Sequence, residues 1–441
     1  MTIKISVIGT GYLGATHAAA MAELGYQVVG VEVDPRRLES LKQGKLPFYE
    51  PGLDEVLVAN IESGRLRFTD DAGEAAAWAD VQFVCVGTPQ QPGSDKADMR
   101  YVYSAIDALA PHVKEGALIV GKSTVPVGTT AELKARFLAA QPDRTDVRFA
   151  WNPEFLREGF ALEDTLHPDR VVIGVEEPSA EQTLRHVYAP MITEGIPFIV
   201  TDITTAELVK VAANSFLATK ISFINAMAEV CEAAGGDVTT LAEAIGHDVR
   251  IGNKFLSAGV GFGGGCLPKD IRAFSARAEE IGAGRAVAFL GEVDAINLRR
   301  RDRIVELTRD LIGDDLTGRP ITVLGATFKP DSDDIRDAPS LAVATMLDAL
   351  GARVTVHDPK GIPNAQRAQP QLAYEADLIE AVRGADVVVH LTEWREYRAA
   401  DPADLLAVVG APNVVDGRNV LDVDLWRAAG WSMRAPGRDL S

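Results

Sequence analysis

Short runs of Val and Ile alternate with Ala-, Leu- and Glu-rich stretches through the first two hundred residues. Such runs are typical of buried parallel strands, and the stretches between them suit covering helices. We therefore predict an α/β domain whose parallel sheet is covered on both faces. Its strands are expected at Ile3–Ile8, Val28–Val33, Val81–Val86, Leu118–Val120, Val171–Val175 and Phe198–Val200.

The pattern changes near Thr201, where the β-rich runs stop. Residues 204–234 contain no Pro or Gly and predict one long helix, and helical spacing continues to about Ile312. A glycine-dense stretch at 259–265 interrupts this helical region. The arginine run 299–301 falls within it and is interpreted as a solvated helix face.

An α/β pattern then returns toward the C-terminus. Further strands are predicted at Ile321–Leu324, Val354–Val356, Val387–Leu391 and Val414–Val415. The simplest division is an α/β domain at 1–202, a helical connector at 203–314 and a second α/β domain at 315–441.

Composition and charge restrict the classes of function. The chain has 441 residues, 47% of them hydrophobic, and a formal net charge of −19. This charge argues against a nucleic-acid partner but not against small anionic ligands. The three cysteines are too few for a disulfide framework, and no signal peptide or membrane-spanning run is evident. We expect a cytoplasmic protein without a membrane partner or a metal site.

The segment GTGYLG at residues 9–14 follows a predicted strand and opens a predicted helix. In that context Gly9 permits the turn, Gly11 the approach of a pyrophosphate, and Gly14 close packing of helix on strand. Glu32 ends the next strand, near the usual spacing for a carboxylate that holds a ribose. We therefore predict NAD as the cofactor, because this carboxylate would repel the 2′-phosphate of NADP. The alternative is a tight turn in another α/β protein.

The segment GVGFGGGCLPKD at residues 259–270 combines a thiol with a helix start. Its glycines leave Cys266 open to a closely approaching ligand, and Pro268 suits the first turn of a following helix. A thiolate is favoured at a helix N-terminus, and Asp270 lies one turn further along. We interpret Cys266 as a reactive thiol rather than an incidental cysteine in a flexible loop. The other two cysteines lie in apolar patterns and are expected in the core.

Further candidates lie on the long helix and after strand-like runs. Glu207, Lys210 and Asn214 share one helix face, so Lys210 either assists an oxyanion or proton transfer, or extends its ammonium into solvent. Glu154 and Glu158 are either an acid–base pair or exposed acids at a helix start. Three cations follow strands of the second α/β domain and indicate an anionic ligand such as a diphosphate: Lys329, Arg336 and Arg418.

Together these motifs resemble the nucleotide-sugar 6-dehydrogenases of the UDP-glucose/GDP-mannose dehydrogenase family. The resemblance covers nearly the whole chain and rests on GTGYLG (9–14), FYEPGL (48–53), VGTPQ (86–90), KSTVPVGT (122–129), NPEFLREG (152–159), AELVKVAANSFLATKISF (206–223), RIGNKFLSAGVGFGGGCLPKD (250–270), FKPDSDDIRDAPS (328–340) and DGR (416–418). It implies two Rossmann-like, doubly wound domains joined by a long central helix and a helical connector. It also implies at least a homodimer, formed through that helix.

The resemblance further implies a reaction. The C6 alcohol of UDP-glucose would be oxidised to UDP-glucuronate with two NAD and two hydride transfers. Cys266 would capture the C6 aldehyde as a thiohemiacetal, which the second transfer oxidises to a thioester. Lys210 and Asn214 would stabilise the C6 oxygen, Asp270 would assist proton transfer, and Glu154 would assist hydrolysis of the thioester.

The remaining implied roles fall into two sets. The cofactor set comprises Gly9, Gly11, Tyr12, Leu13, Gly14, Glu32, Arg37, Thr88, Thr124, Glu158 and Arg336, of which Thr124 and Glu158 also hold the catalytic water. The substrate set comprises Phe155, Leu156, Lys210, Asn214, Arg250, Phe255, Phe262, Gly263, Phe328, Lys329 and Arg418. Arg250 would reach the sugar from a neighbouring subunit.

Two positions depart from the common family pattern: Glu32 replaces Asp, and Gly265 replaces the Ser before the cysteine. Three alternatives stay open. The substrate could be another nucleotide sugar, such as GDP-mannose or UDP-N-acetylmannosamine. A two-electron dehydrogenase of the 3-hydroxyacid or 6-phosphogluconate type needs no thiol. A non-catalytic sensor on the same scaffold would have no need for the whole set of Cys266, Lys210, Asn214 and Asp270.

Overall fold

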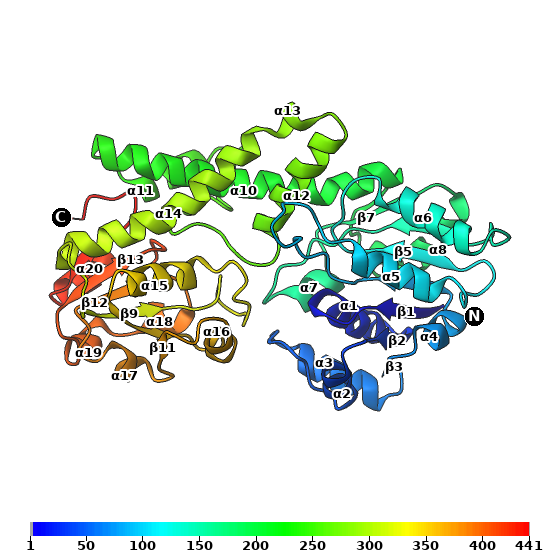
Figure 1. The fold of residues 1–441 in the computed structure, drawn as a ribbon, viewed down its shortest axis with the longest axis horizontal. Coiled ribbons are helices and arrows are strands. Elements are labelled where there is room, and N and C mark those ends of the chain that lie inside the picture. The colour runs from blue at the N-terminus through cyan, green and yellow to red at the C-terminus, as the bar shows by residue number, and fades with distance from the viewer. Residues whose placement is uncertain (1–2, 441) are drawn as a thin grey trace. The chain divides into compact units, whose positions relative to one another are not determined.

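The computed structural model describes residues 3–440 of the chain and divides into two compact units, Met1–Ala213 and Asn214–Ser441 (Figure 1). Residues 1–2 and 441, the outer ends of the first and third predicted domains, lie outside the described residues. Because two units are found, the division into three domains stays a prediction.

The first unit is built on an eight-stranded sheet in the order β3-β2-β1-β4-β5-β6-β7-β8. Its strands are β1 Lys4–Ile8, β2 Gln27–Val31, β3 Leu66–Thr69, β4 Val81–Val84, β5 Leu118–Gly121, β6 Arg148–Trp151, β7 Val171–Val175 and β8 Phe198–Thr201. Strand order reverses between β1 and β4, which is the point where open α/β sheets bind ligands.

Helices cover both faces of this sheet (Figure 1). Adjacent residues of one strand enter different cores: Val28 packs in one hydrophobic cluster and Val29 in the other. The covering helices are α1 Tyr12–Glu23, α2 Pro35–Lys42, α3 Leu53–Glu62, α4 Ala72–Trp78, α5 Arg100–Leu109, α6 Thr129–Ala140, α7 Ala161–Leu166, α8 Pro178–Val187 and α9 Ala189–Thr193. The near-continuous apolar strands follow from burial on both faces.

The second unit holds a six-stranded sheet in the order β11-β10-β9-β12-β13-β14. Every strand pair in it is parallel, and the order repeats that of the first six strands of the other sheet. Its strands are β9 Pro320–Leu324, β10 Arg353–His357, β11 Ala373–Tyr374, β12 Val387–His390, β13 Asn413–Asp416 and β14 Ser432–Arg434.

The long helix α10 spans Ile203–Ala234 and passes from the first unit into the second. The other helices of the second unit are α11 Val238–Gly246, α12 Leu267–Glu280, α13 Gly284–Val287, α14 Phe289–Ile312, α15 Pro339–Ala349, α16 Ile362–Ala368, α17 Leu378–Val382, α18 Arg395–Ala399, α19 Pro402–Leu406 and α20 Val423–Ala428. α14 contacts β12, β13 and β14, so the helical segment is packed directly onto the second sheet.

The sequence predicted ten of the strands and missed β3, β6, β11 and β14. The missed strands are short, and β3 (LRFT) and β6 (RFAW) carry an arginine where a Val/Ile run was sought. The expectation of an all-parallel first sheet is wrong at one pair, because β7 runs antiparallel to β6.

The interpretation of residues 299–301 as a solvated face is also wrong for Arg300. Its side chain is 1% exposed, donates a hydrogen bond to the carbonyl of Gly259 and pairs with Glu229 of α10. Burying this charge requires such partners, and they tie α14 to the glycine-rich segment. Cys85 and Cys231 are buried, as expected.

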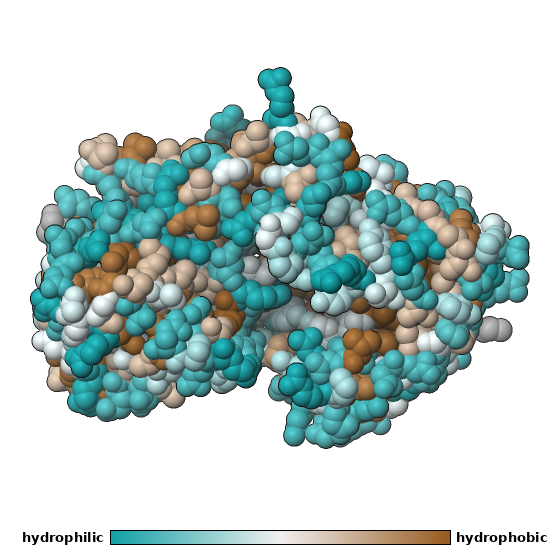
Figure 2. Space-filling view, viewed as in Figure 1, coloured by the Kyte–Doolittle hydropathy of each residue, from teal (hydrophilic) through white to brown (hydrophobic). Residues whose placement is uncertain are grey.

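Hydrophilic residues predominate on the visible face of each unit (Figure 2). Among the described residues, no helix combines the length and the apolar character needed to cross a membrane.

Candidate active site

The turn between β1 and α1 has the geometry that a dinucleotide requires. Gly9 has a φ of +86°, and a Cβ on Gly14 would lie 1.8 Å from the Gly9 carbonyl oxygen. A Cβ on Gly11, by contrast, would meet no heavy atom within 4 Å, which leaves room beside the helix start for a pyrophosphate. Tyr12 and Leu13 open α1 directly after this turn. The residues present therefore fit NAD.

A buried carboxylate stands at the end of the neighbouring strand. Glu32 is 5% exposed, and its two oxygens accept hydrogen bonds from the Thr10 hydroxyl (3.1 Å) and the Asp34 amide (2.9 Å). The longer side chain is thus fixed at the fingerprint turn despite replacing the usual Asp. The Thr88 hydroxyl donates to the Thr124 carbonyl at 2.7 Å and joins two further predicted cofactor residues.

The loop after β6 and helix α10 supply a buried ion pair. Lys210 Nζ lies 3.0 Å from Glu154 Oε1, with side-chain exposures of 7% and 11%. The other Glu154 oxygen accepts the Leu156 amide at 2.9 Å, and Lys210 Nζ lies 5.8 Å from the Phe155 ring centroid. Lys210 is therefore a buried, paired lysine and not one that extends into solvent.

Glu154 and Glu158 do not start a helix. Residues 152–157 are without regular structure, and Glu158 is buried at 9% exposure. The interpretation of these acids as exposed helix-start residues is therefore wrong.

A second buried ammonium lies next to this pair. Lys122 Nζ donates to Asn152 Oδ1 at 2.9 Å, and the Tyr188 hydroxyl donates to the same oxygen at 2.5 Å. Burial lowers the pKa of Lys122 to about 8, and the charges of Cys85 and Glu154 oppose that shift. The KSTVPVGT and NPEFLREG motifs are joined here by Lys122 and Asn152, a contact that their spacing in the sequence does not predict.

In the second unit, Cys266 is exposed at the start of α12, where it is the N-cap residue. Asp270 is 2% exposed and accepts hydrogen bonds from Asn214 Nδ2 at 2.6 Å and from Lys269 Nζ at 2.5 Å. Its amide donates to the Cys266 carbonyl at 3.0 Å, so the predicted helix start is found. The Cys266 thiol and the Asp270 carboxylate therefore lie within one turn of each other at the start of α12. The Asn214 amide that binds Asp270 comes from α10.

The glycines ahead of Cys266 are explained by packing within the unit. A Cβ on Gly263 would lie 2.2 Å from the Asp337 carbonyl oxygen, and one on Gly264, at φ +84°, would meet the Phe328 ring at 2.8 Å. A Cβ on Gly265 would lie 2.2 Å from the Arg336 guanidinium carbon. The absence of Ser at 265 thus lets Arg336 lie against the chain beside Cys266. Phe262 is buried in the same segment.

Arg418 is held by backbone carbonyls. Its guanidinium donates to the carbonyls of Leu391 (2.7 Å), Gly261 (3.0 Å) and Phe328 (3.0 Å), so it links the loops after β12 and β9 to the glycine-rich segment. Lys329 follows Phe328 in one of them, with Nζ 5.7 Å from that ring centroid. Both cations therefore lie at the same edge of the second sheet.

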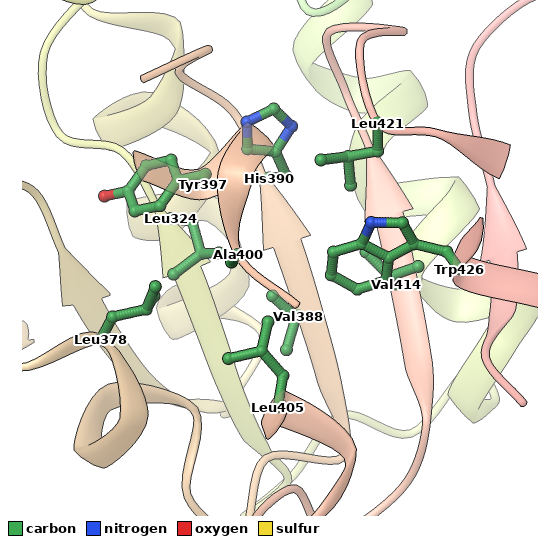
Figure 3. Close-up of a pocket in the computed structure, with 10 residues that line it drawn as sticks. All are labelled: Leu324, Leu378, Val388, His390, Tyr397, Ala400, Leu405, Val414, Leu421 and Trp426. Atoms are coloured by element: carbon green, nitrogen blue, oxygen red, sulfur yellow. The ribbon is translucent and has the colours of Figure 1, made fainter. Parts of the chain in front are cut away.

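The buried pair of His390 and Asp416 lies next to Arg418 at this edge of the sheet. His390 Nδ1 lies 2.9 Å from Asp416 Oδ1, and Asp416 also accepts the Arg418 amide at 3.0 Å. Burial opposes ionisation of Asp416, but the hydrogen bond from His390 lowers its pKa overall. Figure 3 shows the His390 ring among apolar side chains, including Tyr397 and Trp426. That pocket has no room for a water-sized sphere, so it is packing and not a ligand site.

Three of the predicted site residues have exposed side chains. Arg37 is exposed on α2. Arg250 is exposed and pairs with Asp248 at 2.6 Å. Phe255 is 39% exposed and has a φ of +63°. Glu50 and Glu207, for which no role was expected, are buried and hydrogen-bonded. Glu50 lies in the FYEPGL motif, one of those that carry the family resemblance.

Two doubly wound sheets, one with a glycine turn and a buried ribose-side carboxylate that fit NAD, define an NAD-linked dehydrogenase. Three family models match in succession: the NAD binding domain (residues 3–192), the central domain (204–299) and the UDP binding domain (322–423) of the UDP-glucose/GDP-mannose dehydrogenase family. The chain belongs to that family and is an NAD-linked oxidoreductase.

Known proteins that are similar to this chain match it over nearly its whole length. A UDP-glucose 6-dehydrogenase of Rhizobium meliloti is 42% identical over 438 residues, which cover 99% of this chain and 100% of the relative. A solved UDP-glucose dehydrogenase from Pyrobaculum islandicum is 40% identical with a TM-score of 0.87 and 95% coverage of each chain. A solved UDP-D-ManNAc dehydrogenase from Pyrococcus horikoshii has the same TM-score at 25% identity, with both chains covered completely.

Proposed function

We propose that this protein oxidises the C6 alcohol of UDP-glucose to the carboxylate of UDP-glucuronate, with release of two NADH. The observation that carries the proposal is the exposed Cys266 thiol at the N-cap of α12, one turn from a buried Asp270 that is fixed by Asn214. A thiol can hold the oxidised substrate as a thioester that water then cleaves, whereas a two-electron dehydrogenase has no task for it.

The first oxidation needs a base and a stabilised oxygen. The glycine turn at residues 9–14 and Glu32 would hold NAD, which would supply the hydride acceptor for both oxidations at C6. Lys210, which is buried against Glu154, and Asn214 follow each other by one turn on α10, and both supply hydrogen-bond donors to the C6 oxygen. The hydroxyl proton leaves through this set as the aldehyde forms.

The second oxidation proceeds on the enzyme. The Cys266 sulfur adds to the aldehyde carbon, the carbonyl oxygen takes up a proton, and a thiohemiacetal forms. Loss of a second hydride and of the hydroxyl proton gives the thioester. Water then attacks the acyl carbon, the C–S bond breaks, and the carboxylate and the thiol are released. Glu154 and Asp270 are the carboxylates that move protons in these steps, with Thr124 and Glu158 holding the water.

The edge of the second sheet suits the other end of the substrate. We assign the nucleotide diphosphate to the region of Lys329 and Arg418, within the segment that matches a UDP binding domain. Arg250 is exposed, which supports a role toward a second subunit, and a homodimer is therefore part of the proposal. The low cysteine content supports a reducing, cytoplasmic location.

The alternative is the same chemistry on another nucleotide sugar. The stronger identity to UDP-glucose enzymes, 40–42% against 25% for the UDP-D-ManNAc enzyme, favours UDP-glucose.

The test is the number of NADH formed per UDP-glucose consumed, with the product identified by mass. Two NADH and UDP-glucuronate are expected for the wild-type protein. Cys266→Ser is expected to bind UDP-glucose and to lose steady turnover. One NADH per sugar, or full turnover by Cys266→Ser, would contradict the thioester route. Turnover of another nucleotide sugar but not UDP-glucose would favour the alternative.

A further inference from the structure

The FYEPGL motif at residues 48–53 has no part in the chemistry above, yet its carboxylate is buried. Glu50 is 3% exposed. One of its oxygens accepts the Ala161 amide at 2.6 Å, and the other accepts the Gly159 amide at 2.7 Å and the Tyr12 hydroxyl. A buried carboxylate is stable only with such partners, and here they come from two segments that are far apart in the sequence.

Each of these two segments borders a different part of the candidate site. Tyr12 is the first residue of α1, directly after the glycine turn that fits NAD. Gly159 lies near the end of the loop 152–160, which carries Glu154 and Glu158, and Ala161 is the first residue of α7 directly after it. The Gly159 amide lies 3.1 Å from the Tyr12 hydroxyl as well, so the three groups form one closed network.

The neighbouring residues of the motif hold this network in place. Phe48 packs against the Tyr12 ring with a centroid distance of 4.8 Å. Gly52, at φ +76°, starts α3, whose first residue Leu53 is fully buried. Burial and the bond to Glu50 raise the pKa of the Tyr12 hydroxyl, which therefore stays protonated and remains the donor.

We propose that Glu50 is a positioning residue. Through Tyr12, it fixes the glycine turn that fits NAD to the loop that carries Glu154 and Glu158. The effect on the two glutamates rests on the proposed function. The effect on NAD binding does not, because it concerns only the cofactor turn of the first unit.

The test measures NAD binding by calorimetry without any sugar, so that it is independent of turnover. Glu50→Gln replaces one acceptor oxygen by an NH₂ group that faces amide donors. Tyr12→Phe removes only the hydroxyl. Each is expected to raise the dissociation constant for NAD roughly ten-fold, which corresponds to about 1.4 kcal/mol. If Glu50 acts through Tyr12, the double variant is no weaker than either single variant.

Glu55→Gln is the matched control, since Glu55 is exposed on α3 in the same segment, and it should bind NAD like the wild type. Hydrogen exchange at the Gly159 and Ala161 amides is expected to quicken in Glu50→Gln and to stay unchanged in Glu55→Gln. A folded Glu50→Gln protein with unchanged NAD affinity would overturn the proposal. If that variant does not fold, wild-type affinity in Tyr12→Phe would overturn it. The proposal would also be overturned if the increases in the NAD dissociation constant caused by the two single substitutions multiply in the double variant.

Discussion

At the scale of single residues, Lys122 carries a charge where the fold would be more stable without one. The side chain is 7% exposed and its ammonium has one hydrogen bond, to Asn152. The groups that face it are Cys85 and Glu154, which raise its pKa, and Lys210, which lowers it. His17 of α1 is also close enough for Lys122 to lower its pKa, although burial is the larger cause.

The sign of the pH effect follows from the lowered pKa. Lys122 has a pKa of about 8 in the folded chain and 10.5 as the reference value, so the unfolded chain binds more protons between these limits. Stability therefore rises with pH from about 8 to 10.5, and below pH 8 the buried ammonium costs roughly 3 kcal/mol. Such a cost is typical of a group kept for function. We expect that function to be electrostatic support of Glu154, in the role proposed for it above.

We predict that Lys122→Met raises the thermal unfolding midpoint at pH 7 and removes part of the rise between pH 8 and 10, while kcat falls. Lys134→Met is the control, because Lys134 is a more exposed lysine of the same unit, paired with Glu176. Thermal unfolding across this pH range and steady-state kinetics supply both readouts. An equal loss of midpoint at every pH would mean that the ammonium is a stabilising contact instead.

At the scale of elements, Glu207 joins α10 to the start of α6. Its carboxylate accepts the Gly128 amide at 2.6 Å, the Thr130 amide at 2.7 Å and the Thr130 hydroxyl at 2.6 Å. The first amides of a helix have no acceptor within the helix, so the carboxylate from α10 accepts their hydrogen bonds. Its negative charge also interacts favourably with the positive end of the helix dipole. The KSTVPVGT segment is thereby held to the helix that carries Lys210.

Glu207→Gln is expected to destabilise the first unit by roughly 1–3 kcal/mol, because an NH₂ group would face a backbone donor in a buried position. Hydrogen exchange measured on the peptide 124–131 should quicken. Glu132→Gln, at an exposed position on α6 whose carboxylate accepts the Tyr103 hydroxyl, is the control and should leave exchange unchanged. Unchanged protection at Gly128 and Thr130 in the Glu207 variant would show that α6 does not need this carboxylate.

Some helices and strands can be predicted from the sequence alone, and others cannot. Strands with continuous Val and Ile and the Pro- and Gly-free helix α10 were predicted closely, because their local composition and their tertiary burial agree. Strand β6 and Arg300 were not, since partners far along the chain decide their burial. The site behaves alike: the glycine turn and the cysteine segment are local signals, whereas the pairing of Lys210 with Glu154 depends on the fold.

At the scale of the whole molecule, α10 leaves a stripe of large apolar side chains uncovered. Phe216, Phe223 and Val230 are 67%, 48% and 56% exposed and repeat every second turn of the helix. A repeat of this kind forms one continuous seam along a helix, and exposed seams mark protein interfaces. We expect a second copy of the chain to cover it, as the proposed homodimer requires.

Phe223→Asp places a charge in the middle of this stripe and is expected to convert the dimer into monomers, measured by analytical ultracentrifugation. Because Arg250 of the partner subunit is proposed to reach the sugar, kcat/KM for UDP-glucose should fall roughly ten-fold or more, the scale of one lost charge-assisted hydrogen bond. Leu425→Asp, at a 52% exposed position on α20, is the control and should stay dimeric and active. A dimeric Phe223→Asp protein would separate the stripe from assembly, and a fully active monomer would remove the partner's Arg250 from the site.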